Sequence, residues 1–423
     1  MLDIKYIREN ADLVKKAIQL KKVNLNLDEL LQLDQQSLDY KRKLQLLQEE
    51  KNSNAKKMPK ATPEERPGLI ERGRAISQEI SKLEPEAQAK DEELKKLLWL
   101  TPMVPASDAP IGKDDSENVE RKKVGNPPEF SFAFKDHVDV ILKNQWAEFE
   151  KMAAVSGSRM IALKNELALY EFAVLRFALD YLAKKGSTII TVPAMVREAA
   201  LYGTGHFPAG RDQVYFLPED DLYLSGTAEV PLTSLHSGEI LTDAQLPMRY
   251  GAFSPCFRRE AGSAGKDVRG LMRVHQFNKV EQFAFCRNDP DESSHWHAEL
   301  LKTSEEICQA FELPYRVIEV CTGDMGMGKF RMHDIECWVP SEKKYRETHS
   351  CSSLHDWQAR RANLRYRDKE DKVKFIHTLN NTAVATPRIL ISLLENHQLE
   401  NGAVHVPKAL QPYMGGVDRI GGK

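Results

Sequence analysis

The sequence predicts an α+β protein in which an N-terminal antiparallel coiled-coil arm is joined to a body made of an antiparallel sheet flanked by helices. Apolar residues recur at alternating spacings of three and four between positions 30 and 47 and again between 69 and 97, as they do in paired helices. In the second half of the chain, most expected strands follow one another without an intervening helix. That order favours an antiparallel sheet over a doubly wound nucleotide-binding fold.

Length and composition limit the class of protein. The 423 residues are enough for two or more domains, and the net charge of −2 means that any nucleic-acid-binding surface must be local. The N-terminal stretch MLDIKYIREN is charged throughout and no run of about eighteen apolar residues occurs, so we expect a cytoplasmic protein without a membrane segment. The six cysteines form no CxxC pair, which favours reduced structural thiols over a zinc or disulfide framework.

The first hundred residues predict a helical foot and a long arm. Residues 1–27 indicate short helices with one apolar face, formed by Ile7, Val14 and Ile18. Each of the two following helices has about thirty residues and would extend roughly 45 Å, farther than a globular core requires. The reversal between them is marked by three prolines, which cannot continue a helix: Pro59, Pro63 and Pro67. Pro85 should kink the second helix.

A linker and a second domain should follow the arm. The prolines Pro102, Pro105 and Pro110 indicate the linker, so we expect a helical domain at 1–104 and a second domain at 105–423. A long helical pattern at 155–185 ends at Gly186 and precedes a strand at 187–193. Further strands are expected at about 213–224, 248–260, 273–286, 315–321, 332–339 and 344–350, and helices at about 228–237, 291–312 and 387–397.

The stretch from 257 to 283 indicates a hairpin with a charged face. Its sequence, FRREAGSAGKDVRGLMRVHQFNKVEQF, predicts two antiparallel strands joined by a long loop that contains glycine. Strand alternation places Cys256, Arg258 and Glu260 on one face of the first strand. On the second strand it places on one face Arg273, His275, Phe277, Lys279 and Glu281.

This mixture of side chains fits a nucleotide site. Arginines can form paired hydrogen bonds with phosphate, an aromatic ring can stack on a base, and Glu281 lies roughly 13 Å beyond Phe277 at strand rise. A solvated amphipathic hairpin with cross-strand ion pairs fits the same alternation. Neither a GxxxxGK[ST] phosphate loop nor a GxGxxG after a strand occurs, so ATP would need another type of site.

The pattern F-R-x-E, a glycine-bearing loop and R-x-x-x-F resembles motif two of class II aminoacyl-tRNA synthetases. The flanking GSAGKDVRGLMRVHQF is similar to the seryl-tRNA synthetase family in particular. The resemblance continues nearly along the whole chain, through SGTAEV at 225–230, ETHSCSS at 347–353 and LNNTAVATPR at 379–388. It implies a class II synthetase-like antiparallel sheet and a homodimer formed through the helix and strand that end at Pro193 (motif one).

The resemblance also implies an activity and its partners. A member of this family uses ATP and Mg²⁺ to convert serine into seryl-adenylate and pyrophosphate, and then transfers serine to the 3′ end of tRNA(Ser) and also of tRNA(Sec). The arm would grip the long variable arm of the tRNA. Its phosphate contacts would come from basic residues near the tip: Lys51, Lys56, Lys57, Lys60, Arg72 and Arg74.

For ATP, the resemblance implies a catalytic set of Arg258, Arg388 and Glu347. Arg258 would hold the α-phosphate and the serine carboxylate, and Arg388 the γ-phosphate. Glu347 and Ser350 would hold Mg²⁺. The whole implied ATP site consists of Arg258, Arg259, Glu260, Arg273, Val274, Phe277, Glu347, Thr348, His349, Ser350 and Arg388. Within it, Phe277 would stack on adenine, Glu260 would accept from its amino group, and Arg273 would meet the β- or γ-phosphate.

For serine, the resemblance implies a small polar pocket. Two carboxylates suit an ammonium group and a hydroxyl, and such a pocket rejects alanine because its polar groups would be left unpaired. The implied serine site consists of Thr227, Ala228, Glu229, Arg258, Glu281, Asn380 and Thr382.

Structural alternatives remain for several of these residues. Phe277 fits a core position, with the nearby arginines paired to Glu260 and Glu281. Thr227 and Glu229 fit a helix cap followed by an acid in the first turn. The charges of the arm fit a solvated coiled-coil face.

Two further alternatives concern the last two motifs. Arg388 follows Thr386 and Pro387 in an expected first helical turn, where the helix dipole disfavours a cation, and it could pair with Glu395 instead of a phosphate. A soft-metal site could be built from His349, Cys351 and His355, although their spacing fits no standard zinc arrangement.

Two other functions fit parts of the sequence. One is an adenylate-forming paralogue that loads an amino acid onto a carrier protein, and the long arm argues against it. The other is an inactive scaffold paralogue, against which the presence of Arg258, Glu281, Glu347 and Arg388 argues.

Overall fold

The chain is analysed in a computed structural model that describes residues 1–262 and 269–422. It divides into two compact units, Met1–Pro102 and Met103–Lys423. The centre of the hairpin loop expected between 257 and 283 therefore lies outside the described residues.

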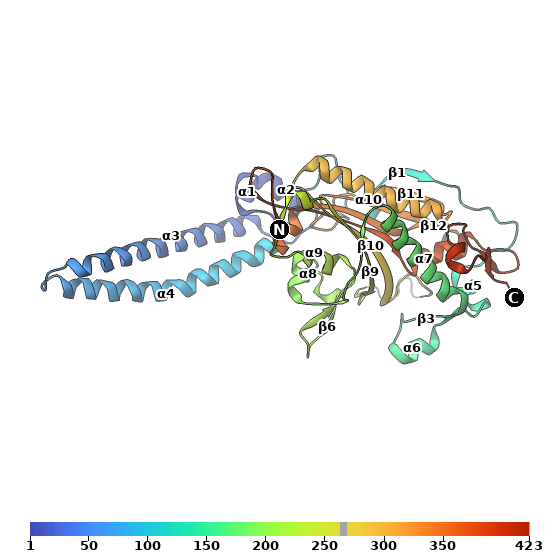
Figure 1. Ribbon diagram of the computed structural model, residues 1–423, viewed down its shortest axis with the longest axis horizontal. Coiled ribbons are helices and arrows are strands. Elements are labelled where there is room, and N and C mark those ends of the chain that lie inside the picture. The colour runs from blue at the N-terminus through green and yellow to red at the C-terminus, as the bar shows by residue number, and fades with distance from the viewer. Residues whose placement is uncertain (263–268, 423) are drawn as a thin grey trace. The chain divides into compact units, whose positions relative to one another are not determined.

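The N-terminal unit is entirely helical among its described elements (Figure 1). Two short helices, α1 (Ile4–Glu9) and α2 (Ala11–Leu20), bury the predicted apolar face. The long helices α3 (Leu27–Lys57) and α4 (Arg66–Trp99) then form the expected hairpin, with a single 3₁₀ turn at Met58–Lys60. The reversal lies where the three prolines predict it, and α4 continues through Pro85 to its end.

Polar side chains interrupt the apolar interior of the arm. Leu30 and Ile76 are fully buried, but the polar residues Ser37 and Asn54 are also buried, at 2% and 8% exposure. The Ser37 hydroxyl donates to Asp91 (2.5 Å), and the Asn54 amide donates to the Leu69 carbonyl (2.7 Å). Each of these bonds joins α3 to α4 at one position only, so they fix the register of the two helices in the way that isolated polar residues do in coiled coils.

The C-terminal unit is built on an eight-stranded sheet with the order β1-β11-β12-β13-β16-β10-β9-β4. All neighbouring strands are antiparallel except β4 and β9, which pair in parallel at one edge. The strands are β1 (Val119–Val124), β11 (Tyr315–Glu319), β12 (Arg331–Val339), β13 (Lys344–His355), β16 (His377–Ala385), β10 (Gln276–Cys286), β9 (Met248–Phe257) and β4 (Thr188–Thr191). The predicted fold class, an arm plus an antiparallel sheet with flanking helices, is confirmed.

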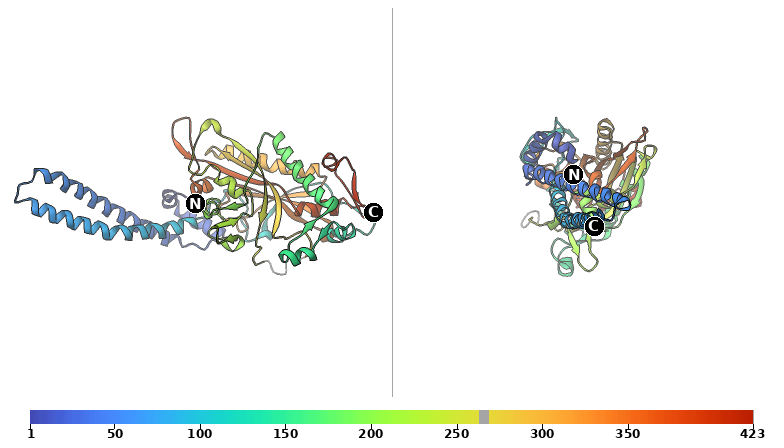
Figure 2. Two further views of the ribbon diagram at one scale, coloured as in Figure 1. Left: turned by 60° about the horizontal axis from the view of Figure 1, so that its bottom comes forward. Right: turned by 90° about the vertical axis from the view of Figure 1, so that its left-hand side faces the viewer.

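Three helices form the main core with this sheet: α7 (Asn165–Lys184), α10 (Pro290–Ala310) and α12 (Arg388–Asn396). Helices α7 and α10 lie along one face of the sheet, where the Phe177 and Phe311 rings pack at 5.2 Å (Figures 1 and 2). Gln282 and Asn381 point to this face and donate to the Ser304 hydroxyl on α10. Their sequence neighbours on β10 and β16 therefore face the other side of the sheet.

Smaller elements surround the sheet. The helices are α5 (His137–Lys143), α6 (Glu150–Ser156), α8 (Glu198–Thr204), α9 (Glu229–Ser234) and α11 (Trp357–Ala362). The short strands are β2 (Ala147–Glu148), β3 (Ala162–Leu163), β5 (Met195–Val196), β6 (Tyr215–Leu217), β7 (Leu222–Leu224), β8 (Ile240–Thr242), β14 (Arg365–Arg367), β15 (Val373–Phe375), β17 (Ala403–His405) and β18 (Arg419–Gly421). None of the described helices is both long and apolar enough to cross a lipid bilayer.

Several predicted element boundaries differ from the structure: the strand expected at 344–350 continues to His355, for example. Two of the differences have a clear physical reason. The helix expected from 155 begins only at Asn165, because Gly157 adopts a positive φ of 88° after α6 and the strand β3 intervenes. The first hairpin strand, expected to reach 260, ends at Phe257, and Glu260 has a positive φ of 51°. Strand alternation therefore does not place Glu260; a turn does.

The arm offers a matched test of its interior. We expect Ile76→Ala to destabilise the arm by about 2–5 kcal/mol, because Ile76 is fully buried and the change leaves a cavity. Ile70→Ala is the control, since Ile70 on the same helix is 46% exposed. Thermal unfolding followed by circular dichroism should show an earlier helical transition only for the first variant. Equal transitions in both variants would contradict the described packing.

Candidate active site

A cavity of about 240 Å³ opens on the face of the sheet opposite α10. It is lined by β10, β13 and β16, by the start of α12 and by several loops. The predicted site residues that line it are Thr227, Glu229, Arg258, Glu260, Arg273, Val274, Phe277, Glu281, Glu347, Thr348, Ser350, Asn380, Thr382 and Arg388. Three predicted residues do not: Ala228, Arg259 and His349.

One end of the cavity, here called the acidic end, contains two buried carboxylates. Glu229 is 7% exposed and Glu281 is fully buried, and the Asn380 amide donates to both at 3.2 Å. Lys279 forms an ion pair with Glu281 and donates to the Thr227 hydroxyl (2.7 Å). Burial raises the pKa of Glu229, but the charge of Lys329 and a hydrogen bond from Gln358 more than offset it, so the pKa lies below its ordinary value. The negative charges of both buried carboxylates are therefore balanced by the groups around them.

The acidic end also presents an unused acceptor. The side-chain oxygen of Asn380 is buried and has no hydrogen-bond partner among the described residues. A buried carbonyl oxygen without a partner costs free energy, which a ligand donor such as an ammonium or hydroxyl group would recover. Glu281 pairs in register with Thr382, so a hydroxyl lies beside the carboxylate.

The residues that sequence reasoning missed lie mostly on loops. Lys279 was on the predicted charged face, and strand alternation could have assigned it to the site. His206 and Lys329 follow no periodic pattern. Their loops are placed by Trp357, because added Cβ atoms at Gly205 and at Gly328 would lie 2.4 Å and 2.6 Å from its ring. No local signal in the sequence predicts this packing.

The hydrogen bonds of His206 fix its protonation. The Thr204 hydroxyl donates to helix carbonyls of Ala200 and Leu201, so it accepts from Nδ1 of His206 at 2.8 Å. Burial lowers the pKa of His206. The neutral ring therefore carries its proton on Nδ1, and Nε2 is an acceptor.

The other end of the cavity is basic. The Arg258 guanidinium lies over the Phe277 ring at 5.1 Å and its Nε donates to the Gly226 carbonyl. Arg273 forms an ion pair with Glu260 (2.5 Å) across the hairpin. The alternative in which the hairpin arginines pair with carboxylates therefore holds for Arg273 and Glu260. It is wrong for Glu281, whose partner is Lys279. Phe277 is only half-buried, so it does not occupy the core position that the same alternative gave it.

Arg388 lies in the first turn of α12, as predicted, but the helix begins at Arg388 itself and not at Pro387, and the surroundings of Arg388 differ from the prediction. Its Nη1 lies 3.3 Å from the Glu347 carboxylate, and its Nε donates to the Met272 carbonyl (3.4 Å). The helix is preceded by Pro387 as N-cap, and Thr386 instead donates to Glu171. The alternative pairing of Arg388 with Glu395 is wrong, because Glu395 is fully buried against other donors.

A β-bulge in β13 determines which of the predicted residues on this strand face the cavity. The register of β12 with β13 shifts between Ile335 and Glu336, so Thr348 is an extra residue on β13. Glu347 and Ser350 are three positions apart, yet both line the cavity because the bulge changes the alternation between them. His349 is turned into the core instead.

His349 is neither a cavity residue nor part of a metal site in the described structure. Its Nε2 donates to the Ala383 carbonyl (3.1 Å), and burial lowers its pKa to about 4. Cys351 contacts His297 and His355 stacks on His377, so the three residues of the soft-metal alternative have separate neighbours. Among described residues, no group of three or more His, Cys, Asp or Glu side chains is placed to hold a metal ion.

The Lys279–Glu281 pair offers a test of the acidic end. We expect Lys279→Met to destabilise the protein by about 3–5 kcal/mol, because it leaves a fully buried carboxylate unpaired. Adding Glu281→Gln to this variant should restore much of the stability, since the uncompensated charge is removed. Urea unfolding of the two variants measures both effects. A double variant no more stable than Lys279→Met would show that the pair is not the cause.

Comparison with known proteins gives two family matches. Residues 1–105 match the seryl-tRNA synthetase N-terminal domain, and residues 216–397 match the class II tRNA synthetase core domain (G, H, P, S and T). Among curated proteins, the chain is 53% identical to a serine–tRNA ligase of Deinococcus radiodurans, covering 100% of this chain and 99% of that protein. It is 42% identical to one of Thermococcus onnurineus, covering 98% and 96%.

Two solved structures resemble the chain over its whole length. A seryl-tRNA synthetase of Pyrococcus horikoshii complexed with ATP has a TM-score of 0.93 at 39% identity, covering 100% of this chain and 99% of that chain. A cytoplasmic serine–tRNA ligase of Naegleria fowleri in complex with AMP has a TM-score of 0.88 at 29% identity, with the same coverage.

Proposed function

The chain belongs to the seryl-tRNA synthetase family and ligates serine to tRNA, and we propose that its cavity forms seryl-adenylate from ATP and serine before the transfer. One observation carries the proposal. Arginines and a pair of buried carboxylates occupy opposite ends of one cavity, and β10 runs between them with Phe277 at one end and Glu281 at the other.

We propose that ATP binds the basic end. Phe277 offers a ring face for adenine, and Arg258, Arg273 and Arg388 supply the charge for three phosphates. Glu260 and Arg273 pair with each other across the hairpin, so the nucleotide would exchange this ion pair for contacts to its base and phosphate. Arg258 lines the same cavity as the acidic end, so it can hold the serine carboxylate against the α-phosphate and stabilise the charge that develops there.

We propose that serine binds the acidic end. Glu229, Glu281 and the unused oxygen of Asn380 are acceptors for an ammonium group and a hydroxyl. Thr382 lies in register with Glu281 and can complete the hydroxyl site. Alanine would leave these buried groups unpaired, which is the physical basis for its rejection.

Mg²⁺ is part of the proposal, with Glu347 and Ser350 as its protein ligands. The donor set fits, because both offer hard oxygen atoms. Asp334 supports the fit: it pairs in register with Ser350, its buried Oδ1 has no hydrogen-bond partner among the described residues, and burial together with Glu347 raises its pKa well above the ordinary value. A bound cation would relieve this concentration of carboxylates and would neutralise charge on the phosphates.

Residues 1–104 are proposed as the tRNA-binding domain and residues 105–423 as the catalytic domain. Near the tip of the arm, Lys56, Lys57 and Lys60 gather on one side of the helix reversal. Glu50 forms two hydrogen bonds of 2.7 Å with the guanidinium of Arg72, and we propose that Arg72 therefore contributes less to tRNA binding than the lysines do. We propose that the lysines carry the phosphate contacts.

A homodimer and a cytoplasmic location complete the proposal. The outer side of α7 exposes Leu169 and Phe172 at 60% and 63%, and Ile189 on the edge strand β4 is 40% exposed. Such a patch beside an unpaired strand edge is suited to a second copy. All six cysteines are free thiols, which fits a reducing compartment. The carrier-protein and scaffold alternatives are not favoured, because the chain matches serine–tRNA ligases along its full length.

The amino acid and nucleotide are tested directly by pyrophosphate exchange with each of the twenty amino acids. Serine should support exchange, and alanine and threonine should not. Exchange that is equally fast with another amino acid would overturn the assignment of the acidic end.

The arginines are tested by substitution. Arg258→Ala and Arg388→Ala should each reduce serine-dependent pyrophosphate exchange by at least about 100-fold, because both charges face developing charge on the phosphates. Arg419→Ala is the control, since this exposed arginine pairs only with its neighbour Asp418 among the described residues. Near-normal exchange in either of the first two variants, with an unchanged fold, would contradict their roles.

The proposed separation of tRNA binding from catalysis is tested by deleting the arm between about Leu31 and Leu97. Serine activation should persist, because the cavity is built within Met103–Lys423. Aminoacylation of tRNA should collapse, and tRNA binding by the full chain should weaken steeply with salt. A truncated protein that still charges tRNA efficiently would show that the arm has another purpose.

A further inference from the structure

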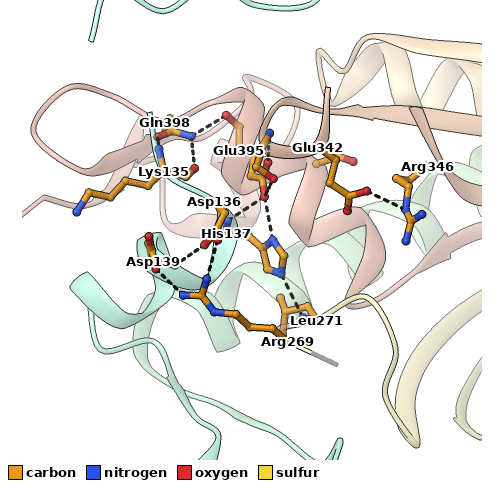
Figure 3. Close-up of polar contacts among 12 residues, drawn as sticks. Lys135, Asp136, His137, Asp139, Arg269, Leu271, Glu342, Arg346, Glu395 and Gln398 are labelled. Atoms are coloured by element: carbon orange, nitrogen blue, oxygen red, sulfur yellow. Dashed lines mark hydrogen bonds and ion pairs between the residues drawn. The ribbon is translucent and has the colours of Figure 1, made fainter. Parts of the chain in front are cut away.

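A hydrogen-bonded cluster joins the second limb of the hairpin, the segment that leads into β10, to helix α12 (Figure 3). Arg388 is the first residue of this helix. The cluster consists of His137 at the start of α5, Glu395 near the end of α12, and Leu271 on the limb that leads into β10. We call these three residues the clasp. Arg269 lies on the same limb, two positions earlier.

Hydrogen bonding fixes the state of the His137 ring. The backbone N–H of Leu271 donates to Nε2 (3.3 Å), so this nitrogen carries no proton. Nδ1 must then be protonated, and it donates to Oε1 of Glu395 (2.9 Å). His137 is therefore a neutral ring that bonds a carboxylate on one side and a backbone amide on the other.

Glu395 is a rigid anchor for this ring. It is fully buried and accepts, besides Nδ1, from the backbone N–H of His137 (2.9 Å) and from the N–H and hydroxyl of Ser341 (2.9 and 3.0 Å). Burial raises the pKa of Glu395, but these hydrogen bonds more than offset it, so its pKa lies below the ordinary value. A carboxylate held by four donors has no freedom to follow a moving loop.

Two other contacts seat the limb against α5 independently. Gly270 has a φ of +83°, and a Cβ there would lie 2.3 Å from Nε2 of His137. Arg269 donates to Asp136 (3.0 Å) and Asp139 (2.7 Å), as Figure 3 shows. The limb therefore fits closely over the imidazole ring.

We propose that His137 is a positioning residue for the nucleotide end of the cavity, an inference that rests on the proposed function. The residue after Leu271 is Met272, whose carbonyl accepts from Arg388, and the next is Arg273, which pairs with Glu260. Glu395 and Arg388 lie two turns apart on α12. The clasp thus fixes the position of Arg273 on the hairpin relative to Arg388 on α12, although His137 acts on both only through other residues.

Two substitutions separate the two halves of the clasp. In His137→Asn the amide nitrogen replaces Nδ1 and can still donate to Glu395, but no acceptor reaches Leu271. In His137→Gln the amide oxygen replaces Nε2 and can still accept from Leu271, but the donor to Glu395 is displaced. Position 137 is 8% exposed, and both side chains are smaller than or similar to imidazole in length.

We expect His137→Asn to raise the KM for ATP in pyrophosphate exchange about tenfold, the equivalent of one lost hydrogen bond. Its KM for serine should stay near that of the unchanged protein, because the acidic end lies at the other end of β10. His137→Gln should keep the KM for ATP within about twofold and should lower the unfolding temperature instead. An unchanged KM for ATP in His137→Asn, or equal rises for ATP and serine, would overturn the proposal.

The hydrogen-exchange rate of the Leu271 amide tests its hydrogen bond to His137 without any measurement of enzyme activity. Exchange should be faster in His137→Asn than in the unchanged protein and should be nearly unchanged in His137→Gln. Should His137→Asn fail to fold, the exchange rate of the Leu271 amide in the unchanged protein keeps the proposal testable: slow exchange supports the hydrogen bond to His137, and exchange as fast as in an exposed loop overturns it. If the unchanged protein lacked serine-dependent exchange, the proposed function would fail, while the exchange rate of Leu271 would still decide whether the clasp exists.

Discussion

The cavity depends on the compensation of two buried carboxylates. Glu229 and Glu281 can lie beneath it only because Lys279, Asn380 and Gln358 surround them with donors. Removing carboxylates from water is costly, and the protein recovers that cost by fixing every neighbour of the pair. A substrate with an ammonium group and a hydroxyl then meets a rigid set of acceptors, and a substrate without the hydroxyl meets the same rigid set with one member unsatisfied. Selectivity and rigidity have the same origin here.

The basic end is organised differently. Its arginines are only partly covered, and their present partners are groups that a nucleotide can replace: Glu260 for Arg273, Glu347 for Arg388 and the Phe277 ring for Arg258. These contacts keep the guanidinium groups in place, and a nucleotide can replace them at modest energetic cost because partly exposed ion pairs are weak. One end of the cavity is therefore set before any ligand arrives, and the other can rearrange around a polyphosphate.

Much of this architecture could be predicted from sequence, for physical reasons that differ between elements. The arm follows from apolar spacing and from three prolines, which act locally, and the cavity residues of β10 follow from alternation along one strand. The failures involve contacts distant in sequence. Glu260 was assigned to a strand that ends in a turn. The alternative pairing of Arg388 with Glu395 fails because His137, 258 residues away, takes that carboxylate. His206 and Lys329 were missed because Trp357 places their loops.

The extra residue at Thr348 has a consequence for how this strand can change over time. Along β13, side chains before and after the bulge follow opposite alternation, so Glu347 and Ser350 share a side although they are three positions apart. Replacing one side chain alters a single contact, whereas deleting a paired residue of the strand would shift the later side chains against their partners and turn them to the other face. Only the extra residue Thr348 could be lost without this shift, so a change of length is tolerated at the bulge alone, while exchange of residues is possible along the whole strand.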